Sequence, residues 1–187
     1  MSASRLDPVT ALVVIDLQKG LLGYPTIHPI EGVLAQANAL AQAFRRCGLP
    51  VVLVNVTGGA PGRTEKPRPG GPFATDFAAF APELEQQPAD HVETKQTWGA
   101  FTGTGLEAFL LARGATQIVL CGVATSIGVE STARHAYELG FNVTLALDAM
   151  TDVNPAAHAN SVAQIFPRLG ETATTTEIIA LLDKPGA

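Results

Sequence analysis

Short apolar runs alternate along this chain with stretches of helical periodicity. Four of the runs end at a polar residue or a glycine: residues 11–15 before Asp16, 51–54 before Asn55, 118–120 before Cys121 and Gly122, and 143–147 before Asp148. Continuous apolar runs suit strands that are buried on both faces, and such strands belong to parallel sheets covered by helices. The pattern therefore predicts four buried parallel strands, with residues 91–94 as a possible fifth.

Helical periodicity fills the intervals between these runs. From residue 30 to residue 47 apolar side chains recur at i, i+3, i+4 and i+7, and the pattern stops at Gly48. Three further stretches have the same character: residues 106–112, 127–139 and 156–165. Alternating strands and helices predict a three-layer α/β sandwich of the doubly wound type with right-handed crossovers. We expect a single domain over residues 1–187.

Polar residues follow the apolar runs at the edge where an open α/β sheet binds its ligands. Such sheets bind ligands beyond the carboxyl ends of their strands, near the point where the strand order reverses. Asp16, Asn55 and Gly122 lie at these ends. Burial raises the pKa of a carboxyl group at the boundary of an apolar core, so Asp16 is a candidate proton donor or acceptor. Capping of the next segment is the alternative role.

Two further segments could contribute to the same edge. Lys95 follows the possible strand at residues 91–94, although a lysine on its own is most often a surface residue. Residues 121–134 join a buried strand to a helix through a glycine-containing turn. The amides of the first helical turn suit an anion or a developing oxyanion, but Thr125 or Ser126 could instead simply cap the helix.

A long loop, residues 57–72, follows the second strand at this edge and is rich in glycine and proline. It carries Arg63, Lys66 and Arg68 against Glu65, a local charge of 3 − 1 = +2 in an acidic chain. Loops of this length are often lids or disordered segments. The sequence leaves two interpretations open: a lid that attracts an anionic substrate, or a solvated loop.

Composition narrows the class of partner. The chain has 12 Lys and Arg against 17 Asp and Glu, a net charge of −5, and no basic cluster of the kind that binds nucleic acid. Its apolar fraction of 47% excludes a disordered chain, and its charged fraction of 16% lies below the ~25% usual for soluble domains. We therefore expect a small-molecule ligand, and neither nucleic acid nor a membrane as partner.

The distribution of apolar and metal-binding residues bears on compartment and cofactors. No apolar run approaches the ~18 residues of a membrane span and the first residues lack a signal-peptide core, so we expect a cytoplasmic protein. The two cysteines, Cys47 and Cys121, have no CxxC spacing, and the four histidines have no metal-ligand spacing. The sequence predicts no metal and no cofactor.

Three segments, in this order, resemble the isochorismatase-like hydrolase superfamily. They are residues 13–18 with Asp16, then Lys95 followed by residues 98–104, and then residues 122–134. The resemblance extends from about residue 10 to residue 182. It implies a six-stranded, mostly parallel sheet between helices, in agreement with the periodicity. Because members commonly self-associate, it also implies a homo-oligomer, a dimer or a tetramer.

The resemblance implies a catalytic site made of Asp16, Lys95 and position 128. Most members carry a cysteine nucleophile there, which the Asp deprotonates so that the thiolate attacks an amide carbonyl. This chain has Gly128 instead, so the usual acyl-enzyme route cannot run at that position. Cys121 lies seven residues earlier at a strand end, and we do not expect it to replace the missing thiol.

The resemblance also implies roles for residues around this site. The amides of Ala124 and Gly128 would form an oxyanion hole, and a cis peptide would join Val123 to Ala124. Four further residues are expected to contact the substrate: Thr125, Gln18, Trp98 and Phe101. For the two aromatic residues, a place in the core is about equally expected.

True isochorismatases resemble this pattern with glycine in place of the cysteine, and they cleave a vinyl ether. In that reaction Asp16 would be a general acid that protonates the enol-pyruvyl methylene, after which water captures the cation and pyruvate leaves. Burial raises the pKa of Asp16 whereas Lys95 lowers it, so the sequence does not decide its protonation. Two alternatives stay open: a water-based amidase with Asp16 as general base, and a catalytically silent binding or scaffold protein.

Two departures limit the substrate. The isochorismatases of siderophore and phenazine pathways carry a tyrosine where this chain has Ala124, which argues against isochorismate itself as the physiological substrate. The nicotinamidase branch binds a metal through paired histidines after the second strand, and residues 57–61 contain none. We therefore expect a metal-independent hydrolase acting on a small anionic molecule.

Overall fold

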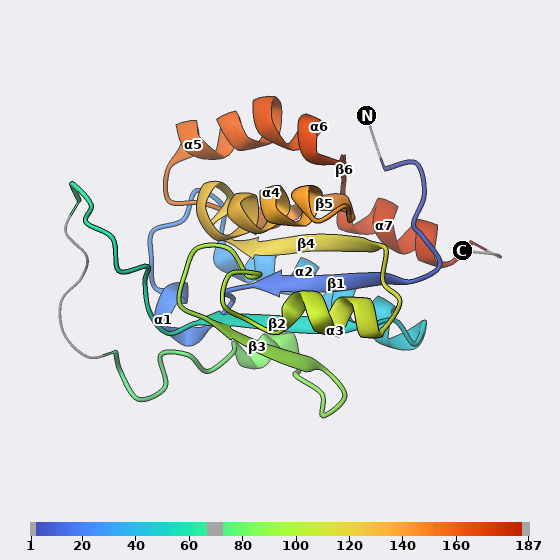
Figure 1. Cartoon of the computed structure of the whole chain (residues 1–187), viewed down its shortest axis with the longest axis horizontal. Helices are drawn as coiled ribbons and strands as arrows, with labels where there is room; N and C mark the ends of the chain where they lie inside the picture. The colour runs from blue at the N-terminus through green and yellow to red at the C-terminus, as the bar shows by residue number, and fades with distance from the viewer. Residues whose placement is uncertain (1–2, 67–72, 185–187) are drawn as a thin grey trace.

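The computed structural model describes residues 3–66 and 73–184 and contains one parallel sheet (Figure 1). Its six strands lie in the order β3-β2-β1-β4-β5-β6, and every neighbouring pair is parallel. Their bounds are β1 Thr10–Ile15, β2 Val51–Val56, β3 His91–Lys95, β4 Gln117–Val123, β5 Asn142–Thr151 and β6 Glu171–Ala173. The predicted α/β sandwich with a six-stranded sheet is confirmed.

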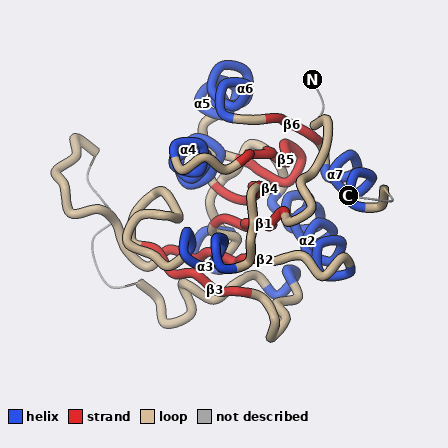
Figure 2. Tube along the Cα trace, turned by 45° about the vertical axis from the view of Figure 1, so that its right-hand side comes forward, coloured by secondary structure: helices blue, strands red, loops and turns tan. Residues whose placement is uncertain are grey.

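Helices cover both faces of the sheet (Figure 2). One face carries α2 (Ile30–Arg46) and α7 (Thr175–Leu182), which pack on each other and on the sheet. The other face carries α3 (Leu106–Ala112), α4 (Glu130–Glu138) and, outside α4, α5 (Pro155–Asn160) and α6 (Phe166–Leu169). The short elements are α1 (Lys19–Leu22), the 3-10 turn η1 (Pro82–Leu84) and the π-helical turns η2 (Thr125–Val129) and η3 (Ser161–Ile165).

The central strands β1, β2 and β4 are mostly apolar because both of their faces are buried. In β1, Leu12 and Val14 join the cluster under α2, whereas Val13 and Ile15 join the cluster under α3 and α4. A continuous apolar run is what such a two-sided core requires. The predicted strand at residues 91–94 is present as β3, at the edge of the sheet, where Val92 is exposed.

Two predicted helices are interrupted in the structure. The prediction for residues 127–139 is wrong at its start, because the turn begins at Thr125 as the π-helical η2 and continues as α4. Residues 156–165 likewise divide into α5 and η3. Apolar periodicity detects which face of a helix is buried but not a single wider turn within it.

The C-terminal elements β6 and α7 were not predicted as separate units. A strand of three residues is too short to leave a periodic pattern. For α7 the sequence does carry a start signal, since Thr174 and Glu177 form a capping box, each bonding to the backbone of the other.

The order of the strands reverses between β1 and β4, which lie side by side at the centre of the sheet. Gly122 is paired with Ile15 in this pair of strands and has φ +113. A Cβ atom at Gly122 would collide with the backbone of Ile15, so only glycine permits this approach. The two chain segments that leave β1 and β4 therefore start next to each other, at the point where doubly wound folds bind ligands.

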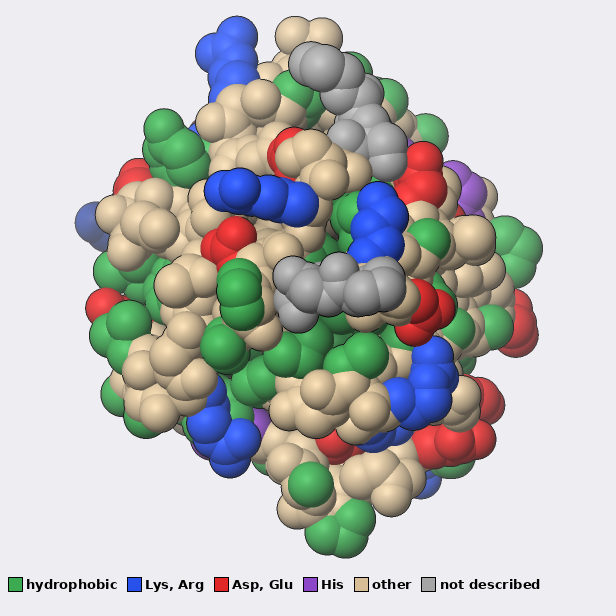
Figure 3. Space-filling view, turned by 90° about the vertical axis from the view of Figure 1, so that its right-hand side faces the viewer, with side chains coloured by type: hydrophobic (Ala, Val, Ile, Leu, Met, Phe, Trp, Pro, Cys, Tyr) green, Lys and Arg blue, Asp and Glu red, His purple; other side chains and the backbone are tan. Residues whose placement is uncertain are grey.

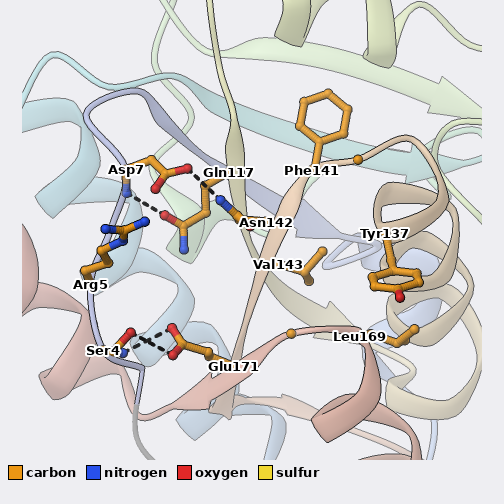
Figure 4. A pocket seen from close by; sticks show the side chains of 12 residues that line it. Ser4, Arg5, Asp7, Gln117, Tyr137, Phe141, Asn142, Val143, Leu169 and Glu171 are labelled. Carbon is orange, nitrogen blue, oxygen red and sulfur yellow. Dashed lines mark hydrogen bonds between the residues drawn. The ribbon is translucent and has the colours of Figure 1, made fainter.

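The opposite edge of the sheet, where the strands begin, holds part of the N-terminal segment and a cavity of about 390 Å³ (Figure 4). The N-terminal segment forms one wall, where Ser4 bonds to Glu171 and Asp7 to Asn142, and Tyr137 and Leu169 form the other. Charges of both signs are interspersed over the face in Figure 3. None of the predicted site residues lines this cavity.

Candidate active site

Asp16 begins the site, immediately after β1. Its φ of 54 is in the left-handed region, which few residues other than glycine, asparagine and aspartate adopt. The backbone is held there because the Asp16 amide donates to Val54 at 2.9 Å and the Asp16 carbonyl accepts from Gln18 at 2.8 Å. The chain thus turns at the end of the strand and leaves the carboxyl group at the carboxyl edge, 5% exposed.

Lys95, the last residue of β3, reaches this carboxyl group from two strands away. Its Nζ lies 2.7 Å from Asp16 Oδ2 and also donates to the carbonyl of Thr97 at 3.1 Å. Lys95 is 2% exposed, so both charges are withdrawn from solvent. The other carboxyl oxygen, Oδ1, is buried and accepts no hydrogen bond from the described residues. Buried acceptors of this kind are rare in folded proteins and mark sites for a ligand or water.

The protonation of Asp16, which the sequence left undecided, follows from this environment. Burial raises the pKa of Asp16 to about 6, and the charge and hydrogen bond of Lys95 lower it without cancelling the effect of burial. The carboxyl group therefore exchanges its proton close to neutral pH, as a general acid or base needs to.

Gly128 lies beside the same carboxyl group, in η2. A Cβ atom built on Gly128 would be 3.3 Å from Asp16 Oδ2, 3.2 Å from the Val123 carbonyl and 2.9 Å from Cγ2 of Ile15. A side chain at this position would therefore face Asp16, but the present packing leaves it too little room. The Gly128 carbonyl accepts a hydrogen bond from Thr132 at 2.7 Å, and Thr132 accepts one from the Ala100 amide at 3.0 Å.

The turn before Gly128 has the expected backbone. The peptide bond between Val123 and Ala124 is cis. The Ala124 carbonyl accepts from the amides of Ile127 at 3.0 Å and Val129 at 3.2 Å, which closes the first turn of η2. The structure thus brings together Asp16, Lys95 and the residues from Ala124 to Gly128, all at the carboxyl ends of β1, β3 and β4.

Of the other expected contact residues, Gln18 and Phe101 are packed inside the protein. Both ends of the Gln18 side-chain amide bond to the backbone of Val56, and its nitrogen also donates to the Phe77 carbonyl at 3.0 Å, so it braces the end of β2. Phe101 is 7% exposed and packs on Phe141, with the ring centroids 6.0 Å apart. Contact of either residue with a substrate stays a prediction.

Trp98 and Thr125 lie at opposite extremes of exposure. Trp98 is 64% exposed and lies three residues after Lys95. Thr125 is fully buried and donates its hydroxyl hydrogen bond to the Thr151 carbonyl at 3.1 Å. A direct contact of Thr125 with substrate is therefore expected only through its backbone.

The two cysteines and the 57–72 loop are the remaining candidates from the sequence. Cys121 points into the core under α2, and burial, with a smaller effect of Asp148, raises the pKa of its thiol to about 12. Cys121 is thus unsuited to act as a nucleophile, whereas Cys47 is exposed. In the 57–72 loop, Arg63 and Lys66 are exposed, and Arg68 lies outside the described residues.

One neighbour of the site was missed by the sequence analysis, which considered the histidines only as possible metal ligands. Nδ1 of His158, in α5, lies 2.9 Å from the Thr125 hydroxyl. The two residues are 33 positions apart, so no local spacing announces their contact. Within residues 3–66 and 73–184, no three His, Cys, Asp or Glu side chains are grouped as metal ligands, and no helix is long and apolar enough to cross a bilayer.

Comparison with known proteins now decides the family. The model of the isochorismatase domain matches residues 10–177 of the chain. This chain belongs to the isochorismatase family. It is a hydrolase of that family, and the match includes Asp16, Lys95 and the whole of η2.

Similar proteins of the isochorismatase family are found by sequence and by structure. The chain is 42% identical over 177 residues to YwoC, an uncharacterized isochorismatase family protein of Bacillus subtilis, covering 91% of this chain and 92% of that one. It is 30% identical to the ureidoacrylate amidohydrolase RutB of Variovorax paradoxus, and the match covers 79% of this chain and 71% of RutB. An isochorismatase family protein of Burkholderia thailandensis superposes with a TM-score of 0.93 at 43% identity, covering 98% of this chain and 100% of that chain.

Proposed function

We propose that this protein hydrolyses a small anionic substrate by proton transfer from Asp16, with water as the nucleophile and without a catalytic thiol. The observation that carries the proposal is the buried pair of Asp16 and Lys95 beside a glycine. A group whose pKa is about 6 is still protonated in about one molecule in ten at pH 7. It can therefore serve as an acid under ordinary conditions.

The surroundings of position 128 support a reaction without a thiol. The backbone of Gly128 lies so close to Ile15 that a Cβ atom would be only 2.9 Å from its methyl group. The buried thiol of Cys121, in the α2-side core, offers no replacement. The groups that the site offers are the carboxyl group of Asp16, the ammonium group of Lys95 and the backbone of η2.

These groups suit the hydrolysis of a vinyl ether that carries a carboxylate. Asp16 would donate its proton to the terminal methylene carbon of the enol-pyruvyl group, which leaves an oxocarbenium ion. Water adds to this cation and loses a proton, and the resulting hemiketal collapses to pyruvate and an alcohol. Lys95 makes two hydrogen bonds among the described residues, so its third N–H can meet an oxygen of the substrate. Exposed Arg63 and Lys66, against Glu65 in the same loop, would attract an anion toward this edge of the sheet.

Hydrolysis of an amide is the second candidate, and the similarity to a ureidoacrylate amidohydrolase favours it. In this case ionised Asp16 would take a proton from water, and the amides of Ala124 and Gly128 would hold the oxyanion. Water is a poor nucleophile toward an amide when neither a thiol nor a metal assists it. For this reason the chemistry of the site favours the more easily protonated vinyl ether.

Product analysis distinguishes these functions. The purified protein is incubated with isochorismate, chorismate and a panel of small amides, and pyruvate and ammonia are followed. Release of pyruvate that is lost in Asp16→Asn is the expected result. The matched control is Asp183→Asn, the same change at an exposed carboxylate directly after α7, which should leave the rate unchanged. Release of ammonia would overturn the vinyl ether in favour of the amide, and absence of both products would favour a binding protein.

A further inference from the structure

The turn that carries Gly128 is fastened at its first two residues to the end of β5. The Thr125 hydroxyl donates to the Thr151 carbonyl at 3.1 Å. The Ser126 amide donates to Oδ2 of Asp152 at 2.7 Å. Asp152 is 1% exposed, and its other oxygen accepts from the Asn154 amide. The position of η2 therefore depends on β5 and on the start of α5.

The hydrogen-bond partners of Thr125 assign the tautomer of His158. Thr125 has one hydroxyl proton, and this proton goes to the Thr151 carbonyl. The contact of 2.9 Å between the Thr125 oxygen and Nδ1 of His158 must then use the proton of the imidazole. Burial, and then the neighbouring His28, lower the pKa of His158, which favours the neutral ring. The geometry thus places a proton on Nδ1 of His158.

His28 connects the same group to the segment that precedes α2. Its amide donates to the Thr151 hydroxyl at 3.1 Å, and its ring meets that of His158 edge to face, with centroids 5.1 Å apart. Thr125, Thr151, His28 and His158 therefore form a closed cycle of contacts. His158 is the member that joins α5 to the first residue of η2.

We propose that His158 is a positioning residue of the active site, which holds the backbone from Ala124 to Gly128 against Asp16 through its Nδ1–H bond to Thr125. Without this donor, the Thr125 hydroxyl keeps its bond to the Thr151 carbonyl, but its oxygen no longer accepts the hydrogen bond from His158. The first turn of η2 then has more freedom, and the amides that meet developing negative charge are less well aligned. The catalytic consequence rests on the proposed function, whereas the structural one does not.

Two substitutions separate the hydrogen bond from the packing of the ring. His158→Asn places a side-chain N–H near the position of Nδ1, and His158→Leu keeps an apolar side chain of similar width without a donor. The matched control is His135→Leu on α4, where the histidine ring packs on Phe101 instead of on Thr125. For each variant we would measure hydrogen exchange of the amides of residues 126–128, kcat and KM, and the free energy of unfolding.

His158→Leu should increase exchange of these amides by about tenfold, the factor expected for one buried hydrogen bond left unmade. It should lower kcat by a similar factor with little change in KM, since the turn acts on the transition state. His158→Asn should restore both, and His135→Leu should change neither. Nitrogen-15 NMR of the wild-type ring should place the proton on Nδ1.

Several results would overturn the proposal. One is equal amide exchange in His158→Leu and the wild type. Another is faster exchange in His158→Asn than in the wild type although the two are equally stable. The third is a ring proton on Nε2 of His158. If neither the wild type nor any variant turns over a compound of the panel, the proposed function fails. The exchange and nitrogen-15 measurements still decide the structural role of His158, because they need no substrate.

Discussion

Lys95→Met tests the electrostatics of the site without any knowledge of the substrate. In the wild type the pKa of Asp16 is about 6 with Lys95 beside it, and burial acts alone when Lys95 is removed. The pKa of Asp16 then rises above 6, so the folded variant keeps a proton that the folded wild type loses. The unfolded chain has already lost this proton, because its Asp16 titrates near the ordinary value of 3.8.

The sign and size of the effect follow from this difference in bound protons. A raised pKa stabilises the folded protein fully below 3.8, and this stabilisation is lost as the pH rises to the folded pKa. For the wild type the loss ends near pH 6, whereas for Lys95→Met it continues at about 1.4 kcal/mol per pH unit. Between pH 6 and pH 8 the variant should therefore lose up to about 2.7 kcal/mol more than the wild type.

Urea unfolding followed by circular dichroism at pH 5.5, 7 and 8 measures this divergence. Lys19→Met is the matched control, because Lys19 pairs with Asp76 at 3.4 Å on the surface. An exposed pair contributes no more than about 1 kcal/mol and should show no such dependence on pH. A constant difference between Lys95→Met and the wild type from pH 5.5 to pH 8 would refute the reasoning.

Three further changes have definite expected results. Gly128→Ala should lower the free energy of unfolding by about 1–3 kcal/mol, because the new Cβ would lie 2.9 Å from Ile15. An unchanged urea midpoint would show that the surrounding side chains accommodate the methyl group without loss of stability. Gly122→Ala should destabilise more than Gly128→Ala, since its Cβ would collide with the Ile15 backbone at φ +113; the same urea titration compares the two. If Asp16 acts as the acid, kcat/KM for pyruvate release should be level below pH 6 and fall about tenfold per unit above it, whereas a rate that rises with pH would assign Asp16 as a base.

Much of the fold could be predicted because its strands are buried on both faces. Continuous apolar runs predicted β1, β2, β4 and β5. The helix α3, Leu106–Ala112, was predicted with its observed bounds. The three-residue β6 could not be found in this way, since its place depends on pairing with β5. The π-helical turn at Thr125–Val129 could not be distinguished from an α-helical turn, because its apolar residues would suit either.

The candidate site was predictable only in part, for a physical reason. Asp16 and the turn around Gly128 follow neighbouring strands, so a correct strand order brings them together. The side-chain contact of Lys95 with Asp16 spans 79 residues and crosses one strand, and only the resemblance to a family suggested it. The contact of His158 with Thr125 left no local signal at all. Burial raises the pKa of Asp16 and Lys95 lowers it, and only the three-dimensional structure shows which of the two effects is larger.

The pKa of Asp16 in the folded protein is the quantity on which the proposed chemistry depends. Carbon-13 NMR of protein labelled at the aspartate carboxyl carbons, titrated from pH 3 to pH 8, measures it directly, and the signal that disappears in Asp16→Asn assigns it. The structure predicts a midpoint at about 6. A midpoint below about 4, the range of an ordinary aspartate, would mean that Asp16 carries no proton near neutral pH, and would contradict its role as the acid.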